Sequence, residues 1–144
     1  MHRTPWPGVI LACMLSTTTV TRAQPAIGPC PDKPNCVSSL ATDKRHFIEP
    51  LRFTGVPAVA WARLRAALQS QARTRIVAEQ DGYLHAECRS LVFRFVDDVE
   101  FVMQPEQMVI QVRSASRTGY SDFGVNRRRV ERLREHLAAS KPPG

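Results

Sequence analysis

Apolar and polar residues alternate along the middle of the chain, over residues 74–89 and again over 99–112. A two-residue period is typical of strands that bury one face. The apolar positions are even-numbered up to Cys88 and odd-numbered from Leu91 to Met103, so we expect a turn, a bulge or a crossover near Ser90. The pattern therefore predicts antiparallel strands that form one sheet with an apolar face.

The loop at residues 80–82 predicts a first hairpin, because it ends in a glycine that readily takes a positive φ. The expected register places Ile76 opposite Ala86 and Ala78 opposite Leu84, with these side chains on the apolar face. The other face is expected to carry Val77, Glu79, Tyr83, His85, Glu87 and Arg89.

A proline at the second position of residues 104–107 predicts a type I turn and a second hairpin. The register that follows sets Met103 opposite Ile110 and Glu100 opposite Arg113. We expect Glu100 and Arg113 to form an ion pair on the solvent-facing side of the sheet, where such a pair contributes roughly 0.2–1 kcal/mol.

Apolar residues recur at three- and four-residue spacing after Pro57, which is typical of a helix with one buried face. We expect this helix to run from about residue 56 to residue 71. Its buried stripe is predicted to consist of Val59, Ala60, Leu64, Ala67 and Leu68.

A second helix is predicted near the C-terminus, with Asn126 as its N-cap and Arg127 as its first residue. Val125 is expected to pack on Val130, and the helix should end near Ala139. Its narrow apolar stripe consists of Val130, Leu133 and Leu137.

The order of these elements predicts one α+β domain over residues 46–144, in which an antiparallel sheet of about four to five strands carries two packed helices. Strand-forming residues surround Pro50 in the segment 46–53, which suits an edge strand. Residues 24–45 contain four prolines and little periodicity, and they are expected to form an extended arm.

The first residues combine the basic Arg3, an apolar run at 9–15 and small residues that end at Ala23. This arrangement is typical of a secretory signal peptide, so we predict a signal peptide over residues 1–23 and an exported protein, periplasmic or secreted. The alternative is a lipid anchor on Cys13, because the residues before it loosely resemble a lipidation motif.

Export favours disulfide bonds, because extracytoplasmic compartments are oxidising. Cys30 and Cys36 enclose a proline-rich loop of five residues, and we expect them to be bonded to each other. Cys88 occupies an apolar strand position and is expected in the core. No metal site or cofactor is predicted, because the chain has no CxxC motif and its four histidines are scattered.

The formal net charge is +7 at pH 7, and loss of Arg3 and Arg22 with residues 1–23 would leave +5. Residues 24–112 carry ten basic and ten acidic side chains, whereas residues 113–144 carry eight and three. This basic region should attract anions. Export and the scarcity of aromatic residues among the arginines argue against nucleic acid. The expected partner is an anionic small molecule or an envelope protein, with electrostatic contact to a membrane surface as a further possibility.

Four segments, CPDKPNCVSS, YLHAECRS, FVDDVEF and RSASRTGYSDFGVNRRRVERLRE, together resemble the domain-of-unknown-function family numbered 1499, over about residues 29–138. The resemblance implies a small exported or envelope-associated domain without an established activity, so it supplies no catalytic residue. Cys88 stands where such domains more often have an aromatic residue, which favours its place in the core.

Residues 113–127 are the best candidate for a binding site. They leave the end of a strand, contain two glycines that let a ligand approach the backbone, and lead into a helix N-terminus that favours anions. The predicted ligand-binding residues are Arg113, Ser114, Ser116, Arg117, Tyr120, Asp122, Asn126 and Arg127, supported by the acids Asp97, Asp98 and Glu100. The competing interpretation is structural, with Arg113 and Arg117 paired to Asp97, Asp98, Glu100 and Asp122.

A small hydrolase is the alternative function, in which Asp97, Asp98 and Glu100 would act as acid and base and Ser114 as nucleophile. A serine nucleophile needs an adjacent base, and the sequence places no histidine there. Neighbouring residues of a strand point to opposite faces, so Asp97 and Asp98 cannot act together without a bulge. We therefore expect a non-catalytic binding or structural module of the cell envelope.

Overall fold

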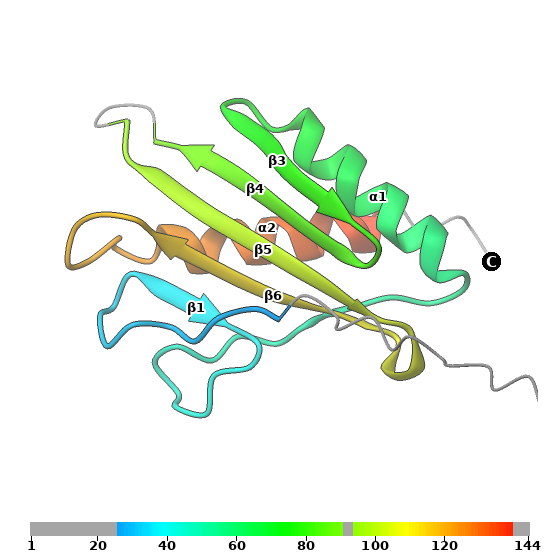
Figure 1. The fold of residues 1–144 in the computed structure, drawn as a ribbon, viewed down its shortest axis with the longest axis horizontal. Helices are drawn as coiled ribbons and strands as arrows, with labels where there is room; N and C mark the ends of the chain where they lie inside the picture. The colour runs from blue at the N-terminus through cyan, green and yellow to red at the C-terminus, as the bar shows by residue number, and fades with distance from the viewer. Residues whose placement is uncertain (1–25, 91–93, 140–144) are drawn as a thin grey trace, which may run out of the picture.

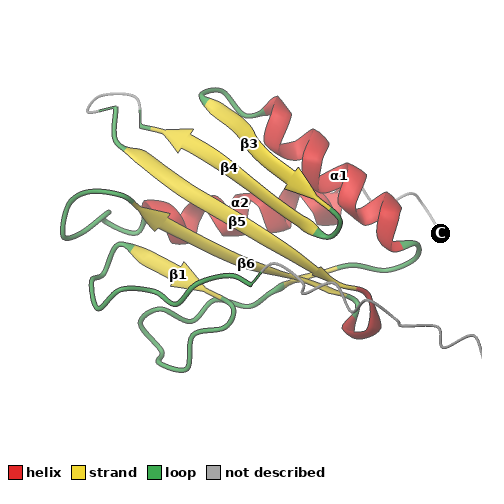
Figure 2. Ribbon diagram, viewed as in Figure 1, coloured by secondary structure: helices red, strands yellow, loops and turns green. Residues whose placement is uncertain are grey.

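The computed structural model describes residues 26–90 and 94–139, which form six strands, two α-helices and one short 3-10 helix, η1 (Figure 2). This architecture confirms the α+β class. In chain order the elements are β1 (Cys36–Ser38), β2 (Leu51–Arg52), α1 (Pro57–Ser70), β3 (Thr74–Gln80), β4 (Tyr83–Arg89), β5 (Val96–Gln104), η1 (Pro105–Gln107), β6 (Val109–Ser116) and α2 (Val125–Ala139).

The strands form one antiparallel sheet in the order β1-β6-β5-β4-β3, and β2 also pairs with β6. Both helices lie on the same face, where α1 contacts β3, α2 contacts β6 and β1, and the two helices contact each other (Figure 1). The sheet has more strands than the four to five that the sequence predicts, because β1 comes from the segment expected to be an arm. We call the side of the sheet opposite the two helices the open face.

The hairpin of β5 and β6 has the predicted register, with Met103 opposite Ile110 and Glu100 opposite Arg113. Pro105 is the first residue of η1, which forms the turn. Met108, the residue after η1, has the left-handed conformation with a φ of 54°. The turn therefore closes in the way that its local sequence indicates.

The register predicted for β3 and β4 is correct at Ile76 and Ala86 but wrong beyond them. A bulge between Ile76 and Ala78 places Ala78 opposite His85, and the connecting loop shortens to two residues. Because one extra residue reverses the alternation, Glu79 turns to the helix-covered face. There it forms an ion pair with Arg65 of α1.

The core lies between the sheet and the two helices. Helix α1 buries four of the five residues predicted for its stripe, whereas Val59 is 47% exposed, so its prediction is wrong. Val59 lies one position beside the stripe that faces the sheet. The largest fully buried side chains include Phe101, Ile48, Leu51, Leu64, Leu68, Leu84, Ile110 and Leu133.

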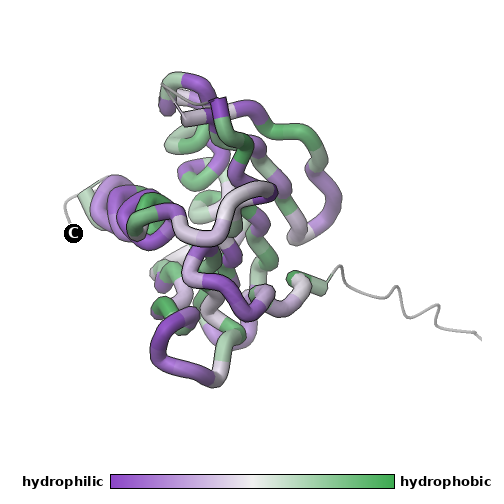
Figure 3. The backbone as a smooth tube through the Cα atoms, turned by 90° about the vertical axis from the view of Figure 1, so that its left-hand side faces the viewer, coloured by the Kyte–Doolittle hydropathy of each residue, from purple (hydrophilic) through white to green (hydrophobic). Residues whose placement is uncertain are grey.

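Helix α2 is mostly hydrophilic, as its colouring in Figure 3 shows. Val130 and Leu133 are fully buried and Leu137 packs against the core, which confirms the predicted stripe. Most of the remaining surface of α2 is arginine-rich and faces away from the core.

Part of the segment 24–45, which the sequence predicts to be an extended arm, joins the sheet, because Cys36–Ser38 form β1. Cys30 and Cys36 form the predicted disulfide, which joins this segment to the start of β1. Val37 of β1 enters the core, and Cys88 is a buried free thiol, as predicted.

The predicted signal peptide and Cys13 lie outside the described residues. Within residues 26–90 and 94–139, no helix is long and apolar enough to cross a membrane.

Candidate functional site

Helix α2 begins two residues earlier than predicted, and Asp122 rather than Asn126 caps it. The Asp122 carboxylate accepts hydrogen bonds from the backbone N–H groups of Gly124, at 2.9 Å, and of Asn126, at 2.8 Å. A carboxylate is favoured there because it satisfies free N–H groups at the positive end of the helix dipole. Asp122 is thus occupied by the helix terminus itself.

Asn126 lies inside the first turn of α2 and points into the protein. Its Oδ1 accepts hydrogen bonds from Ser114 Oγ, at 2.6 Å, and from Arg129 Nη1, at 2.5 Å. Its Nδ2 donates to the carbonyl oxygen of Asn35 and to Ser116 Oγ, both at 3.0 Å. Asn126 therefore ties α2 to the end of β6 and to the residue that precedes β1.

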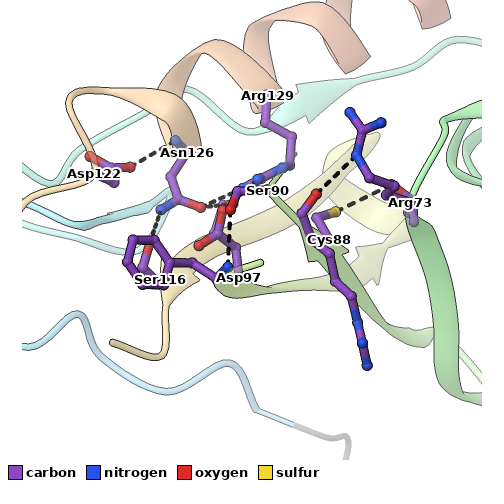
Figure 4. A network of polar contacts seen from close by, with 12 residues as sticks. Arg73, Cys88, Ser90, Asp97, Ser116, Asp122, Asn126 and Arg129 are labelled. Atoms are coloured by element: carbon purple, nitrogen blue, oxygen red, sulfur yellow. Dashed lines mark hydrogen bonds and ion pairs between the residues drawn. The ribbon is translucent and has the colours of Figure 1, made fainter. Parts of the chain in front are cut away.

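A buried ion pair extends this cluster. Arg129 Nη2 donates to Asp97 Oδ2 at 2.5 Å, and the two side chains are only 8% and 6% exposed. Figure 4 shows Asp97, Arg129, Asn126 and Asp122 as a continuous chain of contacts beneath the loop. The sequence analysis did not select Arg129, although 126, 129, 133 and 137 share the spacing of one helix face. We call Asn35, Asp97, Ser114, Ser116, Asn126 and Arg129 the buried network.

A second polar group lies on the open face around Asp98. Arg117 donates from Nε and Nη2 to this carboxylate, at 2.8 and 2.7 Å, and also to Glu87 Oε1 at 2.6 Å. His85 Nε2 lies 2.6 Å from Asp98 Oδ1. The strand alternation thus places Asp97 and Asp98 on opposite faces, as the sequence predicts.

The neighbouring positions of the open face hold a third group. Arg113 Nη1 donates to Glu100 Oε2 at 2.9 Å, which confirms the predicted pair, and the Tyr83 hydroxyl donates to Glu100 Oε1 at 3.0 Å. Burial and the adjacent Glu100 carboxylate raise the pKa of Tyr83 to about 12. Tyr83 is therefore a neutral hydrogen-bond donor at physiological pH.

Desolvation raises the pKa of Asp98, but hydrogen bonds from Arg117 and His85 outweigh it and hold that pKa below its ordinary value. The unfolded chain then binds a proton at a higher pH than the folded protein does. The stabilisation is complete above the ordinary value of 3.8 and is lost as the pH falls through the lower folded pKa.

We predict that Asp98→Asn makes the loss of stability below about pH 4 less steep, because it removes one proton-linked group. Urea unfolding of both proteins between pH 2 and pH 7 measures this slope. Asp32→Asn is the control, since Asp32 is highly exposed. Parallel curves for Asp98→Asn and the unmodified protein would contradict the prediction.

The arrangement does not support the serine hydrolase. Ser114 is fully buried on the helix-covered face, where it hydrogen-bonds to Asn126, whereas His85 lies on the open face. Ser114 therefore lacks both access to a substrate and the adjacent histidine base that a nucleophile requires. Among the described residues, no group of three or more His, Cys, Asp and Glu side chains could hold a metal ion.

Most of the predicted binding residues therefore have internal partners. The structural interpretation is correct for Arg113 and Arg117, but Asp97 pairs with Arg129, and Asp122 caps α2. Arg127 donates to the carbonyl oxygen of Arg45 at 2.9 Å.

The loop that follows β6 nevertheless presents two aromatic side chains to solvent. Tyr120 is 68% exposed and Phe123 is 85% exposed. Phe123 has a φ of 52°, an uncommon conformation for a bulky residue. The preceding residue, Asp122, accepts hydrogen bonds from the N–H groups of Gly124 and Asn126 and so holds this turn of the backbone in place. Sequence analysis selected Tyr120 but not Phe123, because nothing in the local pattern indicates which aromatic residue of a loop is exposed.

The family model described as "Protein of unknown function (DUF1499)" matches residues 26–137. The match covers both the buried network and the open face. A comparison with curated proteins finds no significant match.

Proposed function

The chain belongs to the DUF1499 family of proteins of unknown function, and we propose that it is a non-catalytic binding module that docks on an anionic membrane surface of the cell envelope. The observation that carries this proposal is the pair of exposed aromatic residues, Tyr120 and Phe123, on a loop that the buried network holds in place. Aromatic side chains are favoured at the boundary between lipid and water.

Several arginines lie at the same end of the sheet as the loop that carries Tyr120 and Phe123. The ends of β4 and β6 and the starts of β3 and β5 meet at one end of the sheet, and Arg117 N–H donates to the Val96 carbonyl oxygen there. Phe95 adds a third aromatic side chain, 49% exposed. The exposed arginines at this end are Arg73, Arg89, Arg94, Arg117 and Arg128. We call this end of the molecule, with residues 117–124, the aromatic-basic end.

The charges at this end that have no ion-pair partner among the described residues are positive. Glu87 and Asp98 pair with Arg117, Glu87 also lies 3.9 Å from Arg89, Asp122 caps α2 and Asp97 pairs with Arg129, which leaves Arg73, Arg94 and Arg128 without a carboxylate partner in the described part of the chain. An anionic lipid surface attracts each nearby arginine with roughly 1 kcal/mol, and an aromatic ring that enters the interface adds apolar burial. The combination of both terms favours an anionic membrane over a free small anion, which would use the charges alone.

Co-sedimentation with vesicles tests the proposal. We expect the protein to bind vesicles that contain phosphatidylglycerol, to bind phosphatidylcholine vesicles weakly, and to dissociate as salt rises. Phe123→Ser should weaken binding about tenfold, because an apolar ring leaves the interface. Arg94→Gln should weaken it about fivefold.

Two exposed residues elsewhere provide matched controls. Leu40→Ser removes an apolar side chain that is 52% exposed, and Arg132→Gln removes an exposed arginine of α2. Both variants should bind as the unmodified protein does. If anionic and neutral vesicles bind equally weakly, or if the controls lose as much affinity as Phe123→Ser and Arg94→Gln, the membrane proposal is wrong and a protein partner should be sought.

A further inference from the structure

An apolar cavity of about 320 Å³ lies between α1, α2 and the residues that follow β2, away from the aromatic-basic end. Its volume falls within the range of small-molecule sites, roughly 300–1,000 Å³. In Figure 1 the last turns of α2 lie behind the sheet beside α1. Residues of both helices line the cavity.

The floor of the cavity is formed by core residues. Leu51 of β2 and Ile110 of β6 pair with each other across the strands, and Ala60 of α1 completes the floor. Phe53 and Leu137, which pack against the same core, form the walls. A ligand with an apolar chain would remove these surfaces from water, which is the main driving force for such binding.

The rim of the cavity is cationic. Its lining includes Arg52, Arg63 and Arg134 and no acidic residue. Arg134 is already engaged, because it donates to Glu131 at 2.9 Å and to the carbonyl oxygens of Glu49 and Pro50.

The other two guanidinium groups differ from Arg134. Within residues 26–90 and 94–139, neither Arg52 nor Arg63 makes a side-chain hydrogen bond or an ion pair that fixes it. Arg63 is half-buried on α1 beside the cavity, whereas Arg52 is exposed and lies between Leu51 and Phe53, which both face the core, so its side chain points to the other side of β2. An unpaired Arg63 guanidinium beside an apolar floor suits a ligand that joins an anionic head to an apolar chain, because arginine binds carboxylates in a bidentate manner.

We infer that this cavity is a binding site for a medium-chain fatty acid, with the chain on the Leu51 and Ile110 floor and the carboxylate at Arg63. The volume sets the length of the chain. A cavity of this size holds about ten groups of the size of a water molecule, at roughly 30 Å³ each. A chain of about ten carbons fits that space, whereas a long-chain fatty acid exceeds it.

Isothermal titration calorimetry of the purified protein with decanoate, below its micelle concentration, tests this site. We expect saturable binding of decanoate with one site per chain. Decanol, which has the same chain without the charge, should bind at least tenfold more weakly, and acetate should give no measurable heat. No binding of decanoate would overturn the inference, and equal binding of decanol would overturn the role of Arg63.

Three variants locate the site. Arg63→Gln should weaken decanoate binding roughly tenfold to a hundredfold, as expected for loss of a charged hydrogen bond. Ala138→Trp should abolish it, because Ala138 is exposed at the mouth of the cavity and its replacement leaves the core intact. Arg132→Gln, an exposed arginine of the same helix outside the cavity, should leave binding unchanged.

The variants also separate this site from other outcomes. Circular dichroism should show that all three remain folded. Unchanged affinity in both Arg63→Gln and Ala138→Trp would place decanoate elsewhere and overturn the inference. Because the cavity contains no residue of the aromatic-basic end, this experiment and the vesicle experiment can fail independently.

Discussion

Replacement of Arg129 by methionine should lower the free energy of unfolding by about 3–5 kcal/mol, as expected when one partner of a buried ion pair is removed. The Asp97 carboxylate would remain buried without its cation, and its only compensation would be to bind a proton. Ser114 Oγ and Asn126 Oδ1 would each lose a donor as well. Urea unfolding followed by circular dichroism at pH 7 measures the change.

A double variant distinguishes the ion pair from the general loss of packing. Asp97→Leu in the Arg129→Met background should recover part of the lost stability, because it removes the unpaired charge. Arg132→Met is the matched control on the exposed side of α2 and should change stability by less than about 0.5 kcal/mol. A loss below about 1 kcal/mol for Arg129→Met would show that the pair is not structural.

Asn126→Leu should lower the free energy of unfolding by about 2–4 kcal/mol, because it leaves several buried polar groups unsatisfied at once. Ser114 and Arg129 would lose an acceptor, and Ser116 would lose a donor. The effect should also be local. Amide hydrogen exchange over residues 117–124 should become faster, because Asn126 joins the start of α2 to both β6 and the segment before β1.

The control is Gln69→Leu, which replaces an exposed amide on α1 and should change neither stability nor exchange by a comparable amount. If Asn126→Leu unfolds more readily while exchange over residues 117–124 stays as it is, the loop has another source of order. In that case the buried network would be a stability element alone, and the proposal that it presents Tyr120 and Phe123 would lose its support.

The effects of Arg129→Met and Asn126→Leu should not add, because the two side chains share a hydrogen bond. Ser114, Asn126 and Arg129, the buried polar residues of the segment 113–129, therefore act as one unit. Apart from Asn35 Oδ1, the cluster pairs its buried polar side-chain atoms and ties the end of β6 to the start of α2, while Tyr120 and Phe123 stay exposed.

Local sequence determined the elements that depend on neighbouring residues. The alternation over residues 99–112, together with the proline turn, predicted the register of β5 and β6, because side-chain period and turn geometry act within a few residues. The spacing of apolar residues located both helices. The disulfide could be predicted because Cys30 and Cys36 lie close together in the sequence, on either side of the proline-rich loop.

Tertiary structure decided the features that depend on distant partners. The bulge beside Ala78 turns Glu79 toward Arg65, a contact between a strand and a helix that no local pattern contains. The sequence identified the basic loop at residues 113–127 as a candidate site, but it did not indicate the inward direction of Asn126. Its orientation is set by a carbonyl oxygen 91 residues away and by the charge of Arg129 against Asp97, and such buried polar pairing becomes favourable only once the sheet and α2 enclose it.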